Sequence, residues 1–123
     1  MPHPTEIKVR NRSRLLEVGF DDGTRFQLPF EYLRVYSPSA EVRGHGPDQE
    51  QLQIGKHEVG IKAVEQVGNY AVRISFDDGH DTGLYTWAYL HELGREHATK
   101  WQSYLARLAD LGIPYPTPIH KRK

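Results

Sequence analysis

Two short stretches decide the fold of this chain: Phe20-Asp21-Asp22-Gly23 and, further along, Phe76-Asp77-Asp78-Gly79. Each stretch lies between two runs in which apolar and polar residues alternate; these runs are residues 15–20 and 24–28 for the first, and 70–76 and 80–85 for the second. An Asp-Gly pair between such runs is a strong hairpin signal, because glycine reaches the positive φ of a tight turn without steric cost. The sequence therefore predicts two antiparallel β-hairpins.

The segments that flank the hairpins supply further elements. Residues 6–10 and 59–67 alternate with a period of two, which predicts one more strand ahead of each hairpin. Pro29 ends the first hairpin and suits the first turn of a short helix over residues 30–36. Residues 37–51 are rich in Ser, Pro and Gly and are predicted to form a loop.

The last third of the chain is predicted to be helical. Thr86 can cap a short helix that begins at Trp87 and that Gly94 ends. A second helix over residues 96–111 carries one apolar face, formed by Trp101, Tyr104, Leu105, Leu108 and Leu111. Gly112 and Pro114 end it.

These elements define an expected fold class. We predict an α+β fold in which antiparallel β-hairpins pack against C-terminal helices. The whole of residues 1–123 is expected to form a single domain, with its core at about residues 7–111 and a tail at residues 112–123.

The two hairpin regions echo one another. Phe20-Asp21-Asp22-Gly23 recurs 56 residues later as Phe76-Asp77-Asp78-Gly79, and Leu28 maps onto Leu84 at the same offset. Tyr32-Leu33 maps onto Tyr89-Leu90 one residue further. Either a hairpin–helix unit has been duplicated, or a favourable turn sequence has arisen twice, and the sequence leaves both explanations open.

Composition restricts the function classes. The chain of 123 residues holds 16 acidic and 16 basic residues, so its formal net charge is zero, and it has no Cys. A dedicated nucleic-acid-binding domain carries an excess of Lys and Arg, so no nucleic-acid partner is expected. Without Cys, disulfides and thiolate metal sites are impossible. No apolar run approaches the length of a membrane span, and residues 1–6 lack the pattern of a signal peptide, so we expect no membrane partner and a cytoplasmic location.

The second hairpin holds the densest polar cluster. His80, with Asp78 and Asp81 beside it, could ligate a divalent metal ion, although turn chemistry explains the same residues. The alternative use of this region is an interaction surface made by His80, Asp81, Tyr85 and Trp87. The sequence leaves both possibilities open.

The remaining chemistry-bearing residues do not assemble a catalytic set. The histidines elsewhere are scattered and are expected at the surface: His45, His57, His91 and His97. No phosphate-binding glycine loop and no nucleophile elbow is present. We therefore expect a protein that is not an enzyme, and a small-molecule enzyme is the weakest alternative.

One motif resembles a known family. Residues 78–90, with the sequence Asp-Gly-His-Asp-Thr-Gly-Leu-Tyr-Thr-Trp-Ala-Tyr-Leu, resemble the signature of the gamma-butyrobetaine hydroxylase-like N-terminal domain family, and residues 20–23 and 32–34 also fit its pattern. In the hydroxylase this domain precedes a separate iron- and 2-oxoglutarate-dependent catalytic domain. The family also occurs as short stand-alone bacterial proteins of undefined role, and beside P-loop carrier ATPases of iron–sulfur cluster assembly. The catalytic iron ligands belong to the other domain, so the resemblance does not imply hydroxylase activity.

The resemblance also implies a structural zinc, held by three Cys and one His. The Cys positions fall on Ser37, Ser39 and Val42, and the His position falls on His80. One His cannot hold a structural zinc, so we expect no zinc and no other cofactor. The loop at residues 37–42 is expected either to be held by other contacts or to be mobile.

Together these observations predict a non-catalytic accessory or protein-interaction domain. The partners that the resemblance suggests are a P-loop iron–sulfur carrier ATPase or an oxygenase domain. The alternative is a metal-handling or accessory role in iron–sulfur cluster assembly, with His80 as a ligand. The sequence does not indicate the oligomeric state.

Overall fold

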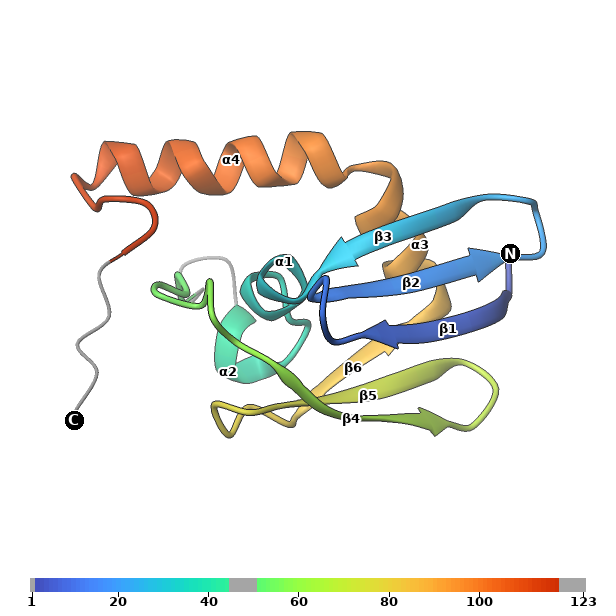
Figure 1. Cartoon of the computed structure of the whole chain (residues 1–123). Coiled ribbons are helices and arrows are strands. Elements are labelled where there is room, and N and C mark those ends of the chain that lie inside the picture. The colour runs from blue at the N-terminus through green and yellow to red at the C-terminus, as the bar shows by residue number, and fades with distance from the viewer. Residues whose placement is uncertain (1, 45–50, 118–123) are drawn as a thin grey trace.

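The computed structural model describes residues 2–44 and 51–117 of the chain. Its elements follow one another in the order β1 (Pro4–Arg10), β2 (Leu15–Phe20), β3 (Arg25–Pro29), α1 (Phe30–Val35), α2 (Ala40–Arg43), β4 (Ile61–Val67), β5 (Ala71–Phe76), β6 (Gly83–Thr86), α3 (Trp87–Arg95) and α4 (His97–Asp110). The strands form two three-stranded antiparallel sheets, β1-β2-β3 and β4-β5-β6 (Figure 1). The predicted α+β class is confirmed.

Both Asp-Asp-Gly stretches form the turns that the sequence predicts. Gly23 and Gly79 have φ values of +87° and +90°, and each donates its N–H to the Phe carbonyl three residues earlier, at 3.1 and 3.3 Å. Such φ values favour glycine, because a Cβ atom in this region meets the backbone. The turns therefore fix the hairpins β2–β3 and β5–β6.

One core joins the two sheets through α1 and α3. The alternate residues of the central strands point inward and are almost fully buried: Leu16, Val18 and Phe20 from β2, and Val72, Ile74 and Phe76 from β5. Tyr32 and Leu33 of α1 and Leu90 and Leu93 of α3 join the same core. Burial of this apolar surface is the main favourable term that holds the two sheets together.

Reciprocal hydrogen bonds link the two halves of the molecule. Tyr32 of α1 donates its hydroxyl to the Leu93 carbonyl at 2.7 Å, and Tyr89 of α3 donates its hydroxyl to the Tyr36 carbonyl at 2.5 Å. Donors and acceptors are both displaced by 57 positions between the two bonds. A reciprocal contact of this kind is what a twofold relation between two like units produces.

The turns repeat the same relation. Asp78, in the second turn, accepts a hydrogen bond from Arg34 Nε of α1 at 2.9 Å, while Asp22, in the first turn, lies 2.9 Å from His91 Nε2 of α3. Each hairpin thus contacts the helix that follows the other hairpin. We call β1–β3 with α1 the first unit and β4–β6 with α3 the second unit; their reciprocal contacts favour duplication over chance recurrence of a turn.

The register corrects one predicted correspondence. Leu28 lies opposite Leu16 in the first unit, and Tyr85 lies opposite Val72 in the second. Leu16 and Val72 occupy equivalent places in the central strands, so Leu28 corresponds to Tyr85, and its predicted match with Leu84 is wrong. One more residue lies between Phe76 and Tyr85 than between Phe20 and Leu28, which shifts the offset from 56 to 57.

Two other predictions change. The expected loop contains α2, a single helical turn capped by Ser39, whose Oγ accepts from the Glu41 N–H at 3.1 Å. Gly94 does not end the helix but lies inside α3, where a Cβ atom would come within 2.3 Å of the Phe26 ring. Its small size serves the close packing of α3 on β3.

Helix α4 lies along the top of the molecule in the view of Figure 1, above α1. Tyr104 and Leu108 are buried against Val35 of α1 in a second, smaller apolar cluster. Leu111 lies beyond the end of the helix and is 64% exposed, so its predicted place on the apolar face is wrong. The Tyr104 hydroxyl donates to the Gln53 carbonyl at 2.7 Å and ties the segment before β4 to this helix.

Candidate functional site

His80 lies just after the second Asp-Asp-Gly turn and is only 5% exposed. Its Nε2 atom is hydrogen-bonded to Ser37 Oγ at 2.8 Å, and its Nδ1 atom lies 3.6 Å from Glu41 Oε1. Burial and the positive charge of Arg34 lower the pKa of His80 below its ordinary value. The imidazole is therefore neutral at pH 7 and connects the β5–β6 turn to the segment between α1 and α2.

Hydroxyl groups extend this contact. Ser39 Oγ lies 2.6 Å from Thr82 Oγ1, and Thr82 donates to Glu41 Oε2 at 2.5 Å. The Ser39 N–H donates to Ser37 Oγ at 3.3 Å. We call Ser37, Ser39, Glu41, His80 and Thr82 the His80 network. It satisfies polar groups that would otherwise be costly to bury.

Asp78 forms an ion pair beside this network. Arg34 Nε donates to Asp78 Oδ2 at 2.9 Å, and Lys56 Nζ lies 2.8 Å from the same oxygen. Burial raises the pKa of Asp78, but the hydrogen bonds from Lys56 and Arg34 outweigh it and lower this pKa to about 2. The Arg34 side chain is only 8% exposed, so the carboxylate compensates a buried charge. These three residues and the five residues of the His80 network together form what we call the second clasp.

The residues of the second clasp do not fit the structural zinc that the family resemblance implies. Ser37, Ser39 and Val42 stand at the three Cys positions and are all buried. Val42 has no donor atom, and the Ser37 hydroxyl is already bonded to His80. Structural zinc requires four donors of the Cys, His or carboxylate type. The loop is instead held by the His80 network.

Two of the three metal ligands proposed from sequence, Asp78 and His80, lie together in the second clasp, where each is bound to other side chains. Asp78 pairs with Arg34 and Lys56, while Asp81 is exposed and lines a hollow that His80 does not line. In residues 2–44 and 51–117, no group of three or more His, Asp and Glu side chains is placed to hold a metal ion. His45 and the basic residues 121–123 lie outside the described residues.

The four residues of the predicted interaction surface also separate. Asp81 is exposed, whereas Tyr85 has no exposed surface and donates its hydroxyl to the Leu33 carbonyl at 2.5 Å. Tyr85 is therefore a core residue, which corrects its assignment to a surface. Trp87 is 8% exposed and lines a groove at the opposite end of β6 from Asp81.

An open face lies on the sheet β4-β5-β6. Helices α1, α3 and α4 all lie on the other side of this sheet (Figure 1). Glu65, Arg73 and Leu84 are cross-strand neighbours there, and Arg73 Nη2 lies 3.1 Å from Glu65 Oε1. A shallow hollow of about 520 Å³ covers part of the face, and it is lined by Glu65, Val67, Arg73, Ser75, Asp81, Thr82 and Leu84. We call these seven residues the open sheet face.

The first hairpin carries a cluster that the sequence analysis missed. His91 Nε2 lies 2.9 Å from Asp22 Oδ2, and the ring packs edge-on against Phe20 and Phe26 at centroid distances of 4.9 and 5.5 Å. Hydrogen bonds from the Thr24 side chain and backbone, with a further one from His91, lower the pKa of Asp22 to about 2. We call Asp22, Thr24 and His91 with these two Phe rings the first clasp.

The histidines differ from the predicted surface positions. His57, His91 and His97 are only partly exposed, and His97 stacks on Tyr32 with ring centroids 4.4 Å apart. Burial lowers the pKa of His97. The internal repeat could have revealed His91, because that residue lies 57 positions after Arg34.

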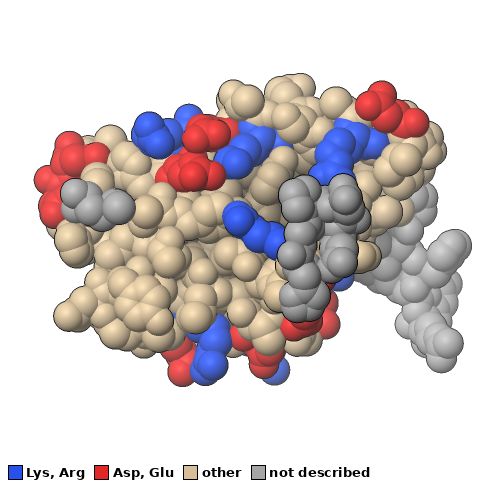
Figure 2. Space-filling view, turned by 180° about the vertical axis from the view of Figure 1, so that it is seen from behind, with Lys and Arg blue, Asp and Glu red and all other residues tan. Residues whose placement is uncertain are grey.

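The charges on the molecule are mixed in sign. Figure 2 shows Lys and Arg side chains beside Asp and Glu side chains along the margins of one face, with mostly other residues between them. This distribution agrees with the formal net charge of zero. Among the described residues, no helix has both the length and the apolar character to cross a membrane.

These features define a class of protein: a small α+β domain of two like units, in which charged residues of each turn are bonded to a helix of the other unit. Residues 7–91 match the family described as gamma-butyrobetaine hydroxylase-like, N-terminal, and the chain belongs to that family. The matched range contains both units except for the first residues of β1 and the end of α3, and α4 lies beyond it.

Solved structures agree with the assignment. The chain is similar to two proteins with NMR solution structures, at 45% and 47% identity, each with a TM-score of 0.81. The alignments cover 98% and 100% of this chain and 94% and 92% of the other chains. A crystal structure of a DUF971-family protein of unknown function from Acidithiobacillus ferrooxidans has 41% identity and a TM-score of 0.64, over 75% of this chain and 92% of that one. No curated protein matches the chain.

Proposed function

We propose that this protein is a non-catalytic interaction domain that binds a partner protein through the open sheet face. The observation that carries the proposal is the exposure of Leu84 in a hollow bordered by both signs of charge. An apolar centre with a polar rim is the arrangement of many protein interfaces.

The second clasp supports this use of the face by fixing its edge. Thr82 and Asp81 follow the second turn, and Thr82 is bonded to Glu41 of α2. The ion pair of Asp78 with Arg34 anchors the same turn to α1. A pre-organised surface loses less entropy on binding, which favours affinity.

The partners to test first are those that the family resemblance suggests. They are a P-loop iron–sulfur carrier ATPase and an iron- and 2-oxoglutarate-dependent oxygenase domain. In either case the domain contributes a binding surface, and the chemistry belongs to the partner.

Affinity measurement with each purified candidate tests the proposal. Leu84→Arg places a charge in the centre of the face and is expected to weaken binding at least about tenfold, the loss typical of a disrupted interface centre. Ala106→Arg adds the same charge to the exposed surface of α4 and is the matched control. Equal affinities for the two variants and the parent protein would show that the open sheet face is not the interface.

A further inference from the structure

Strand β1 has one unpaired edge, on a different sheet from the open sheet face. It is the outer strand of the sheet β1-β2-β3 and pairs with β2. In the β2–β3 hairpin the Phe20 N–H donates to the Thr24 carbonyl at 2.9 Å, so Phe20 faces β3 and its neighbours in β2 face β1. The Asp21 N–H accordingly donates to the His3 carbonyl at 2.9 Å.

The register shows which backbone groups of β1 are unpaired. Glu17 faces β1 and lies opposite Lys8, so the backbone groups of Lys8 are bonded to β2. Adjacent residues of a strand direct their N–H and C=O groups to opposite edges. Ile7 and Val9 therefore direct theirs away from β2, and among the described residues no other element donates to them or accepts from them.

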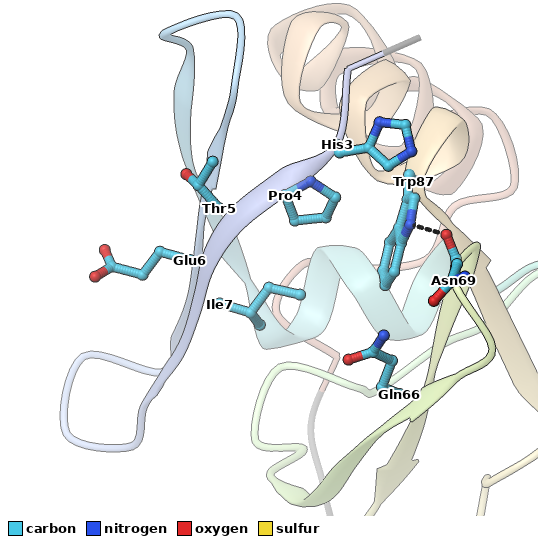
Figure 3. Close-up of a pocket in the computed structure, with 8 residues that line it drawn as sticks. All are labelled: His3, Pro4, Thr5, Glu6, Ile7, Gln66, Asn69 and Trp87. Carbon is cyan, nitrogen blue, oxygen red and sulfur yellow. Dashed lines mark hydrogen bonds between the residues drawn. The ribbon is translucent and has the colours of Figure 1, made fainter.

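A hollow of about 520 Å³ lies beside this edge. It is lined by residues 3–7 and, on its far side, by the end of the β4–β5 hairpin and Trp87. Figure 3 shows the Ile7 side chain turned toward Trp87 and the Glu6 side chain turned away from it. A strand added to β1 would place the side chain next to Ile7 over this hollow.

The equivalent place in the second unit is filled by the protein itself. Phe30 and Trp87 are the first residues of α1 and α3, so the place next to Phe30, beside β4, corresponds to the hollow. There the guanidinium carbon of Arg14 lies 5.9 Å from the centroid of the Phe30 ring, and its Nη2 donates to the Val59 carbonyl just ahead of β4. A side chain thus covers the start of β4, whereas the hollow leaves the start of β1 open.

The charges around β1 favour an acidic occupant. Residues 4–14 hold four basic residues and one acidic residue. Lys8 pairs with Glu6 and Arg10 pairs with Glu17, while Arg12 in the following turn is exposed. The region therefore keeps a net positive charge, which attracts a segment that carries carboxylates.

The faces of β1 determine where apolar and acidic residues of such a segment would lie. Ile7 and Val9 lie opposite the buried Val18 and Leu16 and so share the core face, while Lys8 lies on the outer face. An antiparallel strand would place one side chain directly beside each of these residues. Apolar residues would then cover Val9, which is 37% exposed, and an acidic residue would lie beside Lys8.

We propose that the free edge of β1 binds an extended segment of a partner protein in which acidic and apolar residues alternate. The segment pairs antiparallel with residues 6–10 and exchanges backbone hydrogen bonds with Ile7 and Val9. Addition of a strand to a free sheet edge is a recurring mode of peptide recognition. The bulge between Pro4 and Glu6 ends the regular edge and keeps the contact short.

Amide NMR of the parent protein tests the proposal, with acetyl-Glu-Val-Glu-Val-Thr-amide as the probe. When this peptide pairs antiparallel with residues 6–10, its Val residues lie opposite Val9 and Ile7 and their N–H groups face β1. N-methylation of both Val residues should weaken binding at least about tenfold, whereas N-methylation of both Glu residues, whose N–H groups face away, should leave it unchanged. No saturable shift of the Ile7 and Val9 amides, or equal affinities for the two methylated peptides, would overturn the proposal.

The charge preference has its own control peptide. Exchange of both Glu residues of the probe for Lys should weaken binding about fivefold, because two favourable contacts with the basic region become unfavourable. Equal affinities for the two peptides would overturn the acidic character of the partner segment.

Val9 offers a matched pair of variants. Val9→Pro removes an N–H that faces away from β2, so it should weaken binding of the probe about fivefold, whereas Val9→Ala keeps the N–H and should change it less than about twofold. Equal affinities for the two variants would contradict the proposal, and the methylated peptides test it on the parent protein even if Val9→Pro does not fold. Leu84→Arg should leave the affinity for the probe unchanged, so the β1 edge and the open sheet face can each fail independently.

Discussion

The two clasps use the same backbone arrangement and different side chains. In the first clasp, Asp22 reaches His91, and Phe26 packs against Gly94. In the second clasp, the place that corresponds to Phe26 is Gly83, and the Ser37 hydroxyl fills the space next to it. One end of the molecule is therefore closed by aromatic packing, and the other by buried hydrogen bonds and an ion pair.

This difference shows which polar side chains of the chain serve to hold its structure together. The second clasp contains every residue that the sequence singled out as a metal ligand except Asp81, and each of those has a partner inside the protein. A concentration of His and Asp beside a turn can therefore be a structural device. The surface left for the proposed function is the open sheet face.

The largest expected effect comes from removing the charge partner in the second clasp. Asp78→Ala leaves the Arg34 guanidinium buried without its carboxylate, and we expect a loss of about 3 kcal/mol in the free energy of unfolding. Asp22→Ala, the equivalent change in the first clasp, acts on an exposed carboxylate and should cost clearly less. Urea unfolding of both variants measures the difference, and equal losses would contradict the distinction between the clasps.

Glycine substitutions probe how tightly side chains pack next to each clasp. Gly94→Ala forces a methyl group against the Phe26 ring, and we expect a destabilisation of about 2 kcal/mol because a packed ring cannot move aside. Gly83→Ala meets the Ser37 hydroxyl at 2.6 Å and the Tyr85 ring at the looser distance of 3.2 Å, and it should cost about 1 kcal/mol. Thermal unfolding compares the two, and a reversed order would show that the first clasp is the more adaptable.

The reciprocal tyrosines should behave alike. Tyr32→Phe and Tyr89→Phe each remove one hydroxyl donor from a helix-end carbonyl, so each should lower the free energy of unfolding by about 1 kcal/mol. Chemical denaturation measures both changes. Losses that differ several-fold would show that the two units are not equivalent at this contact.

Acidification should act on the second clasp through His80. The pKa values of His80 and His97 are lowered in the folded protein, so between these values and about 6.5 the unfolded chain binds more protons. Stability is therefore complete above about pH 6.5 and falls as the pH drops below it. Asp78, whose pKa is about 2, loses its contribution only at far lower pH.

Unfolding measured between about pH 7 and about pH 5 checks this dependence. His80→Gln should flatten the decline in part and leave the share that His97 contributes. A parent protein whose stability is constant over this range would contradict the burial of a neutral His80.

The sequence predicted local structure better than contacts between distant segments. Gly23 and Gly79 mark their turns because the required φ is positive, and Thr86 caps α3 as expected, its Oγ accepting from the Tyr89 N–H at 3.1 Å. The predicted helix end at Gly94 is wrong. The glycine is needed for its contact with Phe26, which lies far away in the sequence and which no local pattern reveals. The sequence does not predict the short helix α2, because a single helical turn leaves no periodic pattern of apolar residues.

The candidate site was located only in part. The cluster around His80 was recognised, but its residue types do not reveal that Ser37 and Arg34 would occupy its polar groups. Tyr85 is buried because it lies opposite Val72. The predicted offset of 56 residues places Leu84 at this position instead, so the predicted register is in error by one residue. The pairing of Asp22 with His91 depends on the reciprocal packing of the two units.

Titration of the protein with Zn(II) and with Fe(II), followed by amide NMR, tests the central claim most directly, namely that the second clasp is a structural network. The account predicts that the amides of Ser37, Glu41 and His80 do not shift with metal in large excess, because Nε2 of His80 is bonded to Ser37 and the Asp78 carboxylate is paired. Saturable shifts at these three residues would contradict it and would restore the metal-handling role.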